Sequence, residues 1–322
     1  MVSVAMTTYN GEKYINAQLE SLRDQTLAPD EVVIFDDCST DSTAELVRAF
    51  IADNGLTHWR LTVNSQNMGF VRNFYQAVDA ASGEYIFLCD QDDVWKPDKI
   101  ERMVAVFQAH PYVQALCAGF EMIDSEEQKL PGRASSGLVC GRAGEGGLMK
   151  IGFEEVLWRN IAPGCTSAYT RSCRDFFARY RTGLCPHDWE LNLFGAVLGG
   201  LYYYDAPLTG YRMHGANTIG LAQLKAAERL TAYAHDPRIA SVEEECRRAH
   251  AYQESDWLRS MPSKERRAVE RLVRLTELRH QMFTRKKATL WLALLGHLPD
   301  YWRWRGPQGM LNDLRHIMQR GG

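Results

Sequence analysis

Three aspartates crowd into the segment Asp90-Gln91-Asp92-Asp93, directly after a short apolar run that ends at Cys89. Carboxylates this close repel one another unless a cation or a network of hydrogen bonds compensates their charge. A hard divalent metal is the natural partner, because such an ion is often held by one or two carboxylates and completes its shell with water and substrate phosphates. The segment predicts a site for a hard divalent metal, which a nucleotide diphosphate would fit. An acidic loop that caps the helix after Pro97 is the plainer interpretation.

Polar residues also follow two other apolar runs. Asp36 and Asp37 come directly after residues 32–35, and a carboxylate there can accept a hydrogen bond from the N3–H of a pyrimidine base. Thr8, Tyr9 and Asn10 follow the first run and form a loop suited to bind a nucleoside. Helix capping and a turn at the Asn-Gly pair that begins at residue 10 are the alternatives.

The first hundred residues alternate short β-branched runs with amphipathic helical patterns. This alternation is typical of βαβ units and predicts a parallel sheet. The expected strands cover residues 2–6, 32–35, 60–63 and 85–89, and a helix is expected over 70–81. Ligands of open α/β sheets bind at the carboxyl ends of the strands. The acidic clusters after the second and fourth strands fall at that edge.

The rest of the chain is less regular. Residues 125–150 are rich in Gly, Ser and charge and are expected to form a surface loop. A helix is expected over 188–198, and residues 202–211 read as strand and loop. From about residue 221 onward the pattern is helical and rich in Arg and Glu.

Composition bounds the class of protein. The 322 residues are 45% apolar and 24% charged, as expected of a folded protein, and the net charge of −3 argues against a general polyanion binder. Residues 1–258 contain 23 basic and 35 acidic residues, whereas residues 259–322 contain 14 and 5. None of the eight cysteines lies in a C-x-x-C pair, and no signal peptide precedes the first strand, which predicts a reduced cytoplasmic compartment. The longest apolar stretch, residues 290–295, falls far short of the ~20 residues that span a bilayer.

The order and spacing of several motifs resemble a family 2 glycosyltransferase of the GT-A fold. The motifs are residues 2–10, 32–41, 67–69, 83–86 and 90–95, followed downstream by His187-Asp188-Trp189 and residues 211–217. The forms that these motifs take at residues 90–95 and 187–189 are similar to the same motifs in bacterial rhamnosyltransferases. The resemblance covers about residues 1–220 and implies a mixed α/β sheet flanked by helices. Its nucleotide-binding half would be residues 1–95 and its acceptor half 96–220, with a basic helical region over 221–322.

Family roles carry over onto the matching positions. The resemblance implies that Asp37 contacts the base and that Thr8 and Tyr9 contact the nucleoside, with Asn10 in the same loop. Asp90 would lie near the ribose or a metal-bound water.

The resemblance also implies a metal site. Asp92 would ligate Mg²⁺ or Mn²⁺, and His214, after the last core strand, would be a second ligand that favours Mn²⁺. A structural or exposed histidine is the alternative for His214. Arg212 would reach the phosphates with its fork of donors, or would instead pair with an acid of the sheet.

Inverting transfer needs a base on the acceptor hydroxyl, and Asp188 matches the family's catalytic aspartate. Pro186 and Trp189 would partly desolvate its carboxylate and make it a better base. N-capping of the helix that begins here is the alternative role.

The resemblance suggests L-rhamnose from dTDP-rhamnose as the donor and a hydroxyl of a surface polysaccharide or lipid-linked glycan as the acceptor. Thymine and uracil present the same N3–H edge, so UDP-hexose or UDP-N-acetylhexosamine donors remain alternatives. A sugar nucleotidyltransferase would be expected to carry a Gly-rich loop with Arg or Lys, but residues 7–12 hold one glycine and no basic residue. A non-catalytic nucleotide-sugar or glycan-binding module is the alternative outside enzymes.

The basic tail interleaves cationic, aliphatic and aromatic groups at residues 286–287, 290–295 and 301–305. This pattern is typical of interfacial membrane helices and predicts peripheral contact with the cytoplasmic leaflet. Packing on the catalytic domain is the alternative, and it carries slightly more weight. Nucleic acid is not an expected partner, because the body of the chain is acidic.

Overall fold

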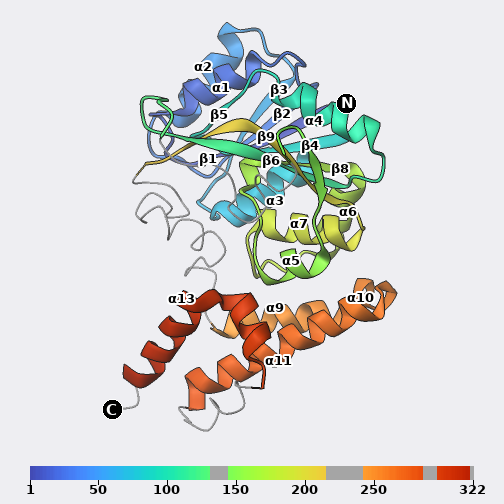
Figure 1. Ribbon diagram of the computed structural model, residues 1–322. Coiled ribbons are helices and arrows are strands. Elements are labelled where there is room, and N and C mark those ends of the chain that lie inside the picture. The colour runs from blue at the N-terminus through green and yellow to red at the C-terminus, as the bar shows by residue number, and fades with distance from the viewer. Residues whose placement is uncertain (131–143, 215–241, 286–295, 320–322) are drawn as a thin grey trace.

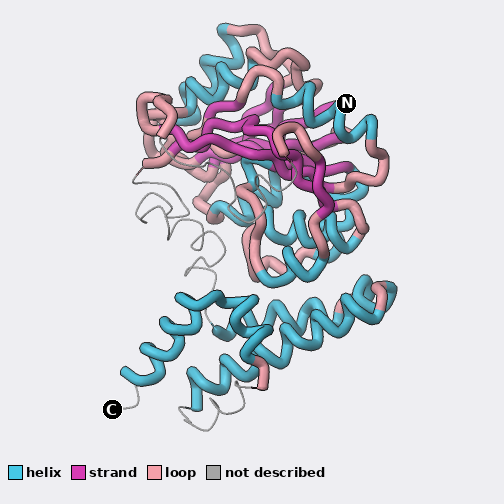
Figure 2. The backbone as a smooth tube through the Cα atoms, in the orientation of Figure 1, coloured by secondary structure: helices cyan, strands magenta, loops and turns pink. Residues whose placement is uncertain are grey.

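The computed structural model describes residues 1–130, 144–214, 242–285 and 296–319. An α/β body is built on one nine-stranded sheet, and a group of C-terminal helices packs below it in the view of Figure 1. Figure 2 shows the strands gathered in the middle of the body, with helices on both sides. The sheet order is β3-β2-β1-β4-β8-β6-β9-β5, and β7 pairs with β9.

The N-terminal half of the sheet is parallel. Its strands are β1 (Val2–Thr8), β2 (Glu31–Asp36), β3 (Trp59–Val63) and β4 (Tyr85–Cys89). Strand β1 lies between β2 and β4, and all three pairs in this half are parallel. The four expected strands are therefore confirmed. Their carboxyl ends meet at one edge, as the βαβ pattern predicts.

The second half makes the sheet mixed. Strand β8 (Ser167–Thr170) is antiparallel to both β4 and β6 (Ala115–Ile123), while β6 runs parallel to β9 (Leu201–Arg212). The short strands β5 (Val94–Trp95) and β7 (Leu148–Lys150) pair antiparallel with β9. This arrangement confirms the expected fold class of a mixed sheet flanked by helices.

Two hydrophobic cores cover the two faces of the sheet. Helices α1 (Ile15–Arg23), α2 (Thr43–Asp53) and α4 (Lys99–Ala109) pack on one face. Helices α3 (Phe70–Ala80), α5 (Phe153–Trp158), α6 (Arg171–Tyr180) and α7 (His187–Val197) pack on the other. Strand β1 contributes side chains to both cores, because successive side chains of a strand point to opposite faces. Val4 joins the first core and Ala5 the second.

The described C-terminal residues are helical: α9 (Val242–Glu254), α10 (Asp256–Ser260), α11 (Ser263–Arg285) and α13 (Leu298–Gln319), which is kinked at Gly306. Trp257 of α10 packs edge-on against Phe153 of α5 and Phe194 of α7, so these helices share a core with the body. Inside the helical group, Arg279 pairs with Glu245 and Asp313 in a buried ionic network.

Several expectations lie partly or wholly outside the described residues. They concern residues 131–143 of the expected loop, the helical pattern over 221–241, and the tail segments 286–287 and 290–295. Among the residues that are described, every cysteine is free. No helix in the described ranges is both long and apolar enough to cross a bilayer.

Candidate active site

A cleft of about 920 Å³ opens at the carboxyl ends of the parallel strands. Its lining combines the nucleoside loop, the acidic turn, the start of α3, the turn at residues 163–164 and the start of α7. The expected site residues that line it are Thr8, Tyr9, Asn10, Asp37, Asp90, Asp92, Asp188 and His214. Five regions that are distant in the sequence therefore meet in one cavity.

Asp37 lines the cleft with its side chain almost fully buried. Its carboxylate accepts hydrogen bonds from the backbone N–H groups of Met68 (2.7 Å) and Gly69 (2.8 Å) and from the Asn64 amide (3.0 Å). Gly69 stands at the N-cap position of α3 with φ of 83°, a conformation that glycine adopts without strain. Asp37 therefore fixes the backbone at the start of α3. Because a carboxylate has about four acceptor sites, Asp37 can accept a hydrogen bond from one more donor.

The acidic turn and the nucleoside loop are joined by one side chain. The Gln91 amide accepts from the Tyr9 N–H at 2.7 Å and donates to the Tyr9 carbonyl at 2.9 Å. Gly11 makes room for it, since a Cβ at that position would stand 2.2 Å from the Gln91 Oε1. This pair of bonds, which we call the Gln91–Tyr9 clamp, sets the position of the acidic turn relative to the loop at residues 8–10.

Asp92 and His214 form the part of the cleft best suited to a metal. The His214 Nε2 lies 2.8 Å from the Asp92 Oδ2, and both side chains are mostly buried. The His214 ring also lies tilted against the Tyr14 ring, with 4.7 Å between the ring centres, which holds it beside the turn. A carboxylate and an imidazole are donor types that Mn²⁺ accepts, and Asp90 lines the same cleft.

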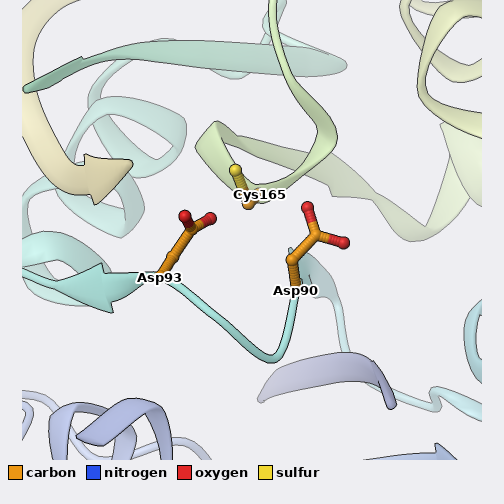
Figure 3. Close-up of side chains that lie close together, drawn as sticks. All are labelled: Asp90, Asp93 and Cys165. Atoms are coloured by element: carbon orange, nitrogen blue, oxygen red, sulfur yellow. The ribbon is translucent and has the colours of Figure 1, made fainter. Parts of the chain in front are cut away.

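A second cluster lies deeper, behind the turn. Figure 3 shows Asp90 and Asp93 at the two ends of the acidic turn, with Cys165 of the short 3₁₀ helix η1 (Gly164–Thr166) facing them, and their ligand atoms lie within 4.8 Å of one another. Burial raises the pKa of the Cys165 thiol well above its usual value, so this sulfur stays protonated and is a poor ligand for a hard cation. Burial and the Asp92 charge raise the pKa of Asp93 to about 7. The cluster therefore suits a structural role better than a metal site.

A buried lysine supports this interior. Lys99 has no exposed surface, and its ammonium donates to the Cys165 carbonyl (2.5 Å) and the Thr209 hydroxyl (2.9 Å). It also lies 3.7 Å from the centre of the Trp95 ring. Burial lowers the pKa of Lys99 to about 8, while the nearby acids favour its charged form. The cation offsets part of the negative charge of the turn.

Arg212 lies behind the acidic turn rather than in the lining of the cleft, and only 1% of its side chain is exposed. Its guanidinium donates to the carbonyls of Asp92 (2.8 Å), Asp124 (3.2 Å) and Ser125 (3.1 Å). It also pairs with Glu127. This geometry does not support the expected contact with the phosphates, because the donors already hold backbone carbonyls. Arg212 instead fixes the turn that presents Asp92.

Asp188 lies in the first turn of α7 and lines the cleft with 3% of its surface exposed. Its Oδ2 accepts from the Asn160 amide at 2.9 Å, and its Oδ1 accepts from the following backbone N–H at 2.8 Å. The N-cap position belongs to Pro186, so Asp188 does not occupy it. Gly164 allows the close approach of η1, since a Cβ there would stand 3.2 Å from the Asp188 Cβ.

His187 lines the same cleft and is 5% exposed. Its ring stacks on Phe74 at 3.8 Å, with Phe70 edge-on at 6.4 Å. Burial lowers the pKa of His187 to about 4, against the smaller opposing effect of Asp188. The imidazole beside Asp188 is therefore neutral near pH 7.

Sequence reasoning did not single out Gln91, Asn160, Lys99 or His187. Gln91 and His187 lie inside recognised motifs. The available sequence signal was that Gln91 stands between two aspartates and that His187 directly precedes Asp188. Asn160 and Lys99 carry no local signal. Their importance comes from contacts with residues 28 and 66 positions away in the chain.

A family profile and several known proteins match this chain in sequence. Residues 3–170 match the sequence profile of Glycosyl transferase family 2, which is more than half of the chain. The dTDP-rhamnosyl transferase RfbG of Shigella flexneri is 29% identical over 230 residues, covering 67% of this chain and 73% of that protein. The uncharacterized protein Rv1520 of Mycobacterium tuberculosis is 28% identical over 221 residues, covering 66% of this chain. The match spans about three fifths of the mycobacterial protein, 59% of its length.

Solved structures show the same architecture. Staphylococcus aureus TarS 1-349 in complex with UDP-GlcNAc aligns with a TM-score of 0.60 at 18% identity, over 100% of this chain and 81% of that chain. The mannosyltransferase PcManGT from Pyrobaculum calidifontis, in complex with GDP-Man and Mn²⁺, aligns with a TM-score of 0.52 at 16% identity, over 99% and 86%. These likenesses concern the fold. The chain belongs to glycosyl transferase family 2, and its α/β body has the GT-A fold.

Proposed function

We propose that this protein is a metal-dependent, inverting glycosyltransferase that moves a sugar from a nucleotide diphosphate to a hydroxyl group. The observation that carries the proposal is that Asp37, Asp92 and Asp188 line one cleft. The part of the cleft at Asp37 would hold the nucleobase, and the part at Asp92 would hold the diphosphate. The part at Asp188 would hold the acceptor. Membership of the family supports the same assignment.

Asp188 is the proposed general base. It would take the proton of the acceptor hydroxyl while the acceptor oxygen bonds to the anomeric carbon and the bond from that carbon to the diphosphate breaks. Asn160 and the backbone N–H of Trp189 hold both carboxylate oxygens, which fixes the orientation of the base. The neutral ring of His187 leaves the charge of Asp188 without a competing cation on the neighbouring residue.

Asp92 and His214 would hold the metal, with Asp90 beside them. A bound Mg²⁺ or Mn²⁺ supplies positive charge next to the leaving diphosphate. Arg212 keeps the turn in place from behind through the Asp92 carbonyl, and Lys99 holds η1 through the Cys165 carbonyl. Asp37 would accept from the N3–H of a thymine or uracil base, and Thr8, Tyr9 and Asn10 would line the nucleoside.

For the donor we propose dTDP-rhamnose. The likeness to a dTDP-rhamnosyl transferase supports this choice. The aromatic and proline side chains near Asp188 also support it, because Phe70, Phe74 and Pro186 form an apolar wall that suits the C6 methyl of a 6-deoxy sugar. UDP-hexose and UDP-N-acetylhexosamine are the competing donors, and a donor panel assayed for nucleotide release distinguishes them.

The proposed acceptor is a hydroxyl of a surface polysaccharide or a lipid-linked glycan, with the enzyme peripheral on the cytoplasmic leaflet. Trp302, Leu298 and Leu311 of α13 are exposed, which supports membrane contact by this helix. Tyr301 and Trp304 are buried against the Arg279 network, so packing accounts for part of the aromatic pattern in the tail.

The decisive variant is Asp188→Asn. We expect it to bind the donor nucleotide with unchanged affinity and to lose transfer by about a hundredfold or more, since an amide cannot take the proton. Asp175→Asn, at an exposed aspartate of α6, is the matched control and should be fully active. Wild-type turnover by Asp188→Asn would remove the base assignment. Donor binding without any transfer by the wild type, across donors and glycan acceptors, would favour a binding module.

A further inference from the structure

Helix α9 of the C-terminal group reaches the catalytic helix α7 from the side opposite the cleft. Arg248 of α9 is 2% exposed, and its guanidinium carbon lies 4.1 Å from the centre of the Trp189 ring. The indole N–H of Trp189 donates to the Val156 carbonyl of α5 at 2.6 Å. The ring that directly follows Asp188 is therefore held between α5 and α9.

A second residue of α9 contacts the same turn of α7. The hydroxyl of Tyr252, one turn beyond Arg248, donates to the Glu190 Oε1 at 3.5 Å and lies 3.6 Å from the Cys185 sulfur. The Glu190 carboxylate in turn accepts from the Thr182 N–H (3.0 Å) and hydroxyl (2.5 Å). Residues on both sides of Asp188 are thus tied to α9.

A charged side chain is unusual at a position as buried as that of Arg248. Its Nε and Nη1 atoms are buried without a hydrogen-bond partner among the described residues. A buried guanidinium is costly unless it is compensated, and here the Trp189 face and the nearby acids Glu190 and Glu245 compensate it. An aliphatic side chain would fill the space without that cost. What the cation adds is an attraction to one face of one ring, which fixes where Trp189 lies.

We propose that α9 is a positioning element of the active site, and that Arg248 holds the first turn of α7 through Trp189 so that Asp188 faces the acceptor. Arg248 is a positioning residue, since it lies behind α7 and outside the cleft lining. This inference rests on the proposed role of Asp188 as the base. It makes the C-terminal helices part of the catalytic unit rather than a separable appendage.

The test compares full-length Arg248→Met with Arg247→Met. Methionine keeps the apolar stem and removes the cation, while Arg247 is a neighbouring arginine that is 57% exposed beside Glu244. We expect Arg248→Met to lower kcat about tenfold to a hundredfold, as a misplaced base does, and to leave the Kd for dTDP and UDP within about twofold. Arg248→Lys should recover part of kcat, and Arg247→Met should match the wild type.

Tyr252→Phe keeps the test decisive if Arg248→Met does not fold. This variant loses one hydroxyl and should lower kcat about threefold with unchanged nucleotide affinity. Unchanged kcat in folded Arg248→Met, or in Tyr252→Phe where the former does not fold, overturns the inference. A parallel loss of nucleotide affinity and kcat also overturns it, because a general loss of structure would explain both.

The two proposals fail in different ways. If Asp188→Asn keeps its turnover, the base assignment is wrong whatever Arg248→Met does. If Asp188→Asn is inactive while Arg248→Met is fully active, only the positioning role of α9 is wrong.

Discussion

Gln91 and Tyr9 lie 82 residues apart in the sequence, yet the side-chain amide of Gln91 bonds both the N–H and the C=O of Tyr9. One end of the clamp is a turn that carries the proposed metal ligand, and the other is the loop that we propose lines the nucleoside. The relationship ties the acidic turn to the loop at residues 8–10 at a fixed distance.

Breaking the clamp should weaken donor binding. Gln91→Ala removes both hydrogen bonds and is expected to raise the donor KM about tenfold, while the thermal midpoint changes little at this partly exposed position. Gly11→Ala should have a similar effect, because its Cβ would displace the Gln91 amide. In a double-mutant cycle the two effects should be clearly less than additive. Gln108→Ala, at an exposed glutamine of α4, is the control, and fully additive effects would contradict the clamp.

Removing the metal or its proposed ligands should abolish transfer. We expect Asp92→Asn and His214→Asn to lower kcat about a hundredfold or more and to weaken nucleotide-stimulated Mn²⁺ binding measured by electron paramagnetic resonance. Excess EDTA should do the same to the wild type, and added Mn²⁺ should restore its activity. Asp98→Asn, at an exposed aspartate before α4, should behave as the wild type. Full activity in EDTA would refute metal dependence.

His187 should make the stability of the fold depend on pH. Its pKa is about 4 in the folded protein, against an ordinary value of 6.5, because burial disfavours the cation. Below pH 6.5 the unfolded chain binds a proton that the folded chain does not bind, so the free energy of unfolding falls as the pH drops from 6.5 to 4.

The size of this effect is measurable by urea unfolding. From the pKa difference, His187 accounts for a loss of about 3 kcal/mol over that window. His187→Gln should lack this component, so the difference in stability between variant and wild type should shift in favour of the variant as the pH falls. A difference that stays constant from pH 7 to pH 4.5 would show that His187 is not held in its neutral form.

The exposed residues of α13 should govern attachment to anionic membranes. We expect Trp302→Glu and Leu311→Glu to weaken sedimentation with vesicles that contain anionic lipid about tenfold, while donor hydrolysis is unchanged. Point substitutions are preferable to truncation, since a deletion after residue 298 would remove Asp313 and expose the buried Arg279. Tyr112→Glu, at an exposed site on the body, is the control. If both variants sediment with vesicles as the wild type does, α13 does not attach the protein to the membrane and its role is to pack on the rest of the protein.

Much of the fold could be predicted because its signals are local. The strand that ends at Cys89 has the predicted bounds, and the helix over 70–81 is confirmed to within one residue. Alternating strands and helices imply parallel pairing, and parallel pairing brings the acids after β2 and β4 to one edge. The antiparallel insertion of β8 between β4 and β6 has no such local signal, since it depends on contacts between residues that are distant in the sequence.

The amino-acid sequence by itself determined which chemical groups this protein could use: the acids of the turn, Asp37 and Asp188, each placed by a motif whose residue types carry the chemistry. The tertiary structure decided what those groups touch. It turned the guanidinium of Arg212 toward backbone carbonyls, buried Lys99 against Thr209, and brought Arg248 onto the Trp189 ring of α7. The physical reason is that hydrogen bonds and burial depend on which surfaces pack together. Packing brings together residues that are far apart in the chain, and no local sequence pattern indicates which of them will be in contact.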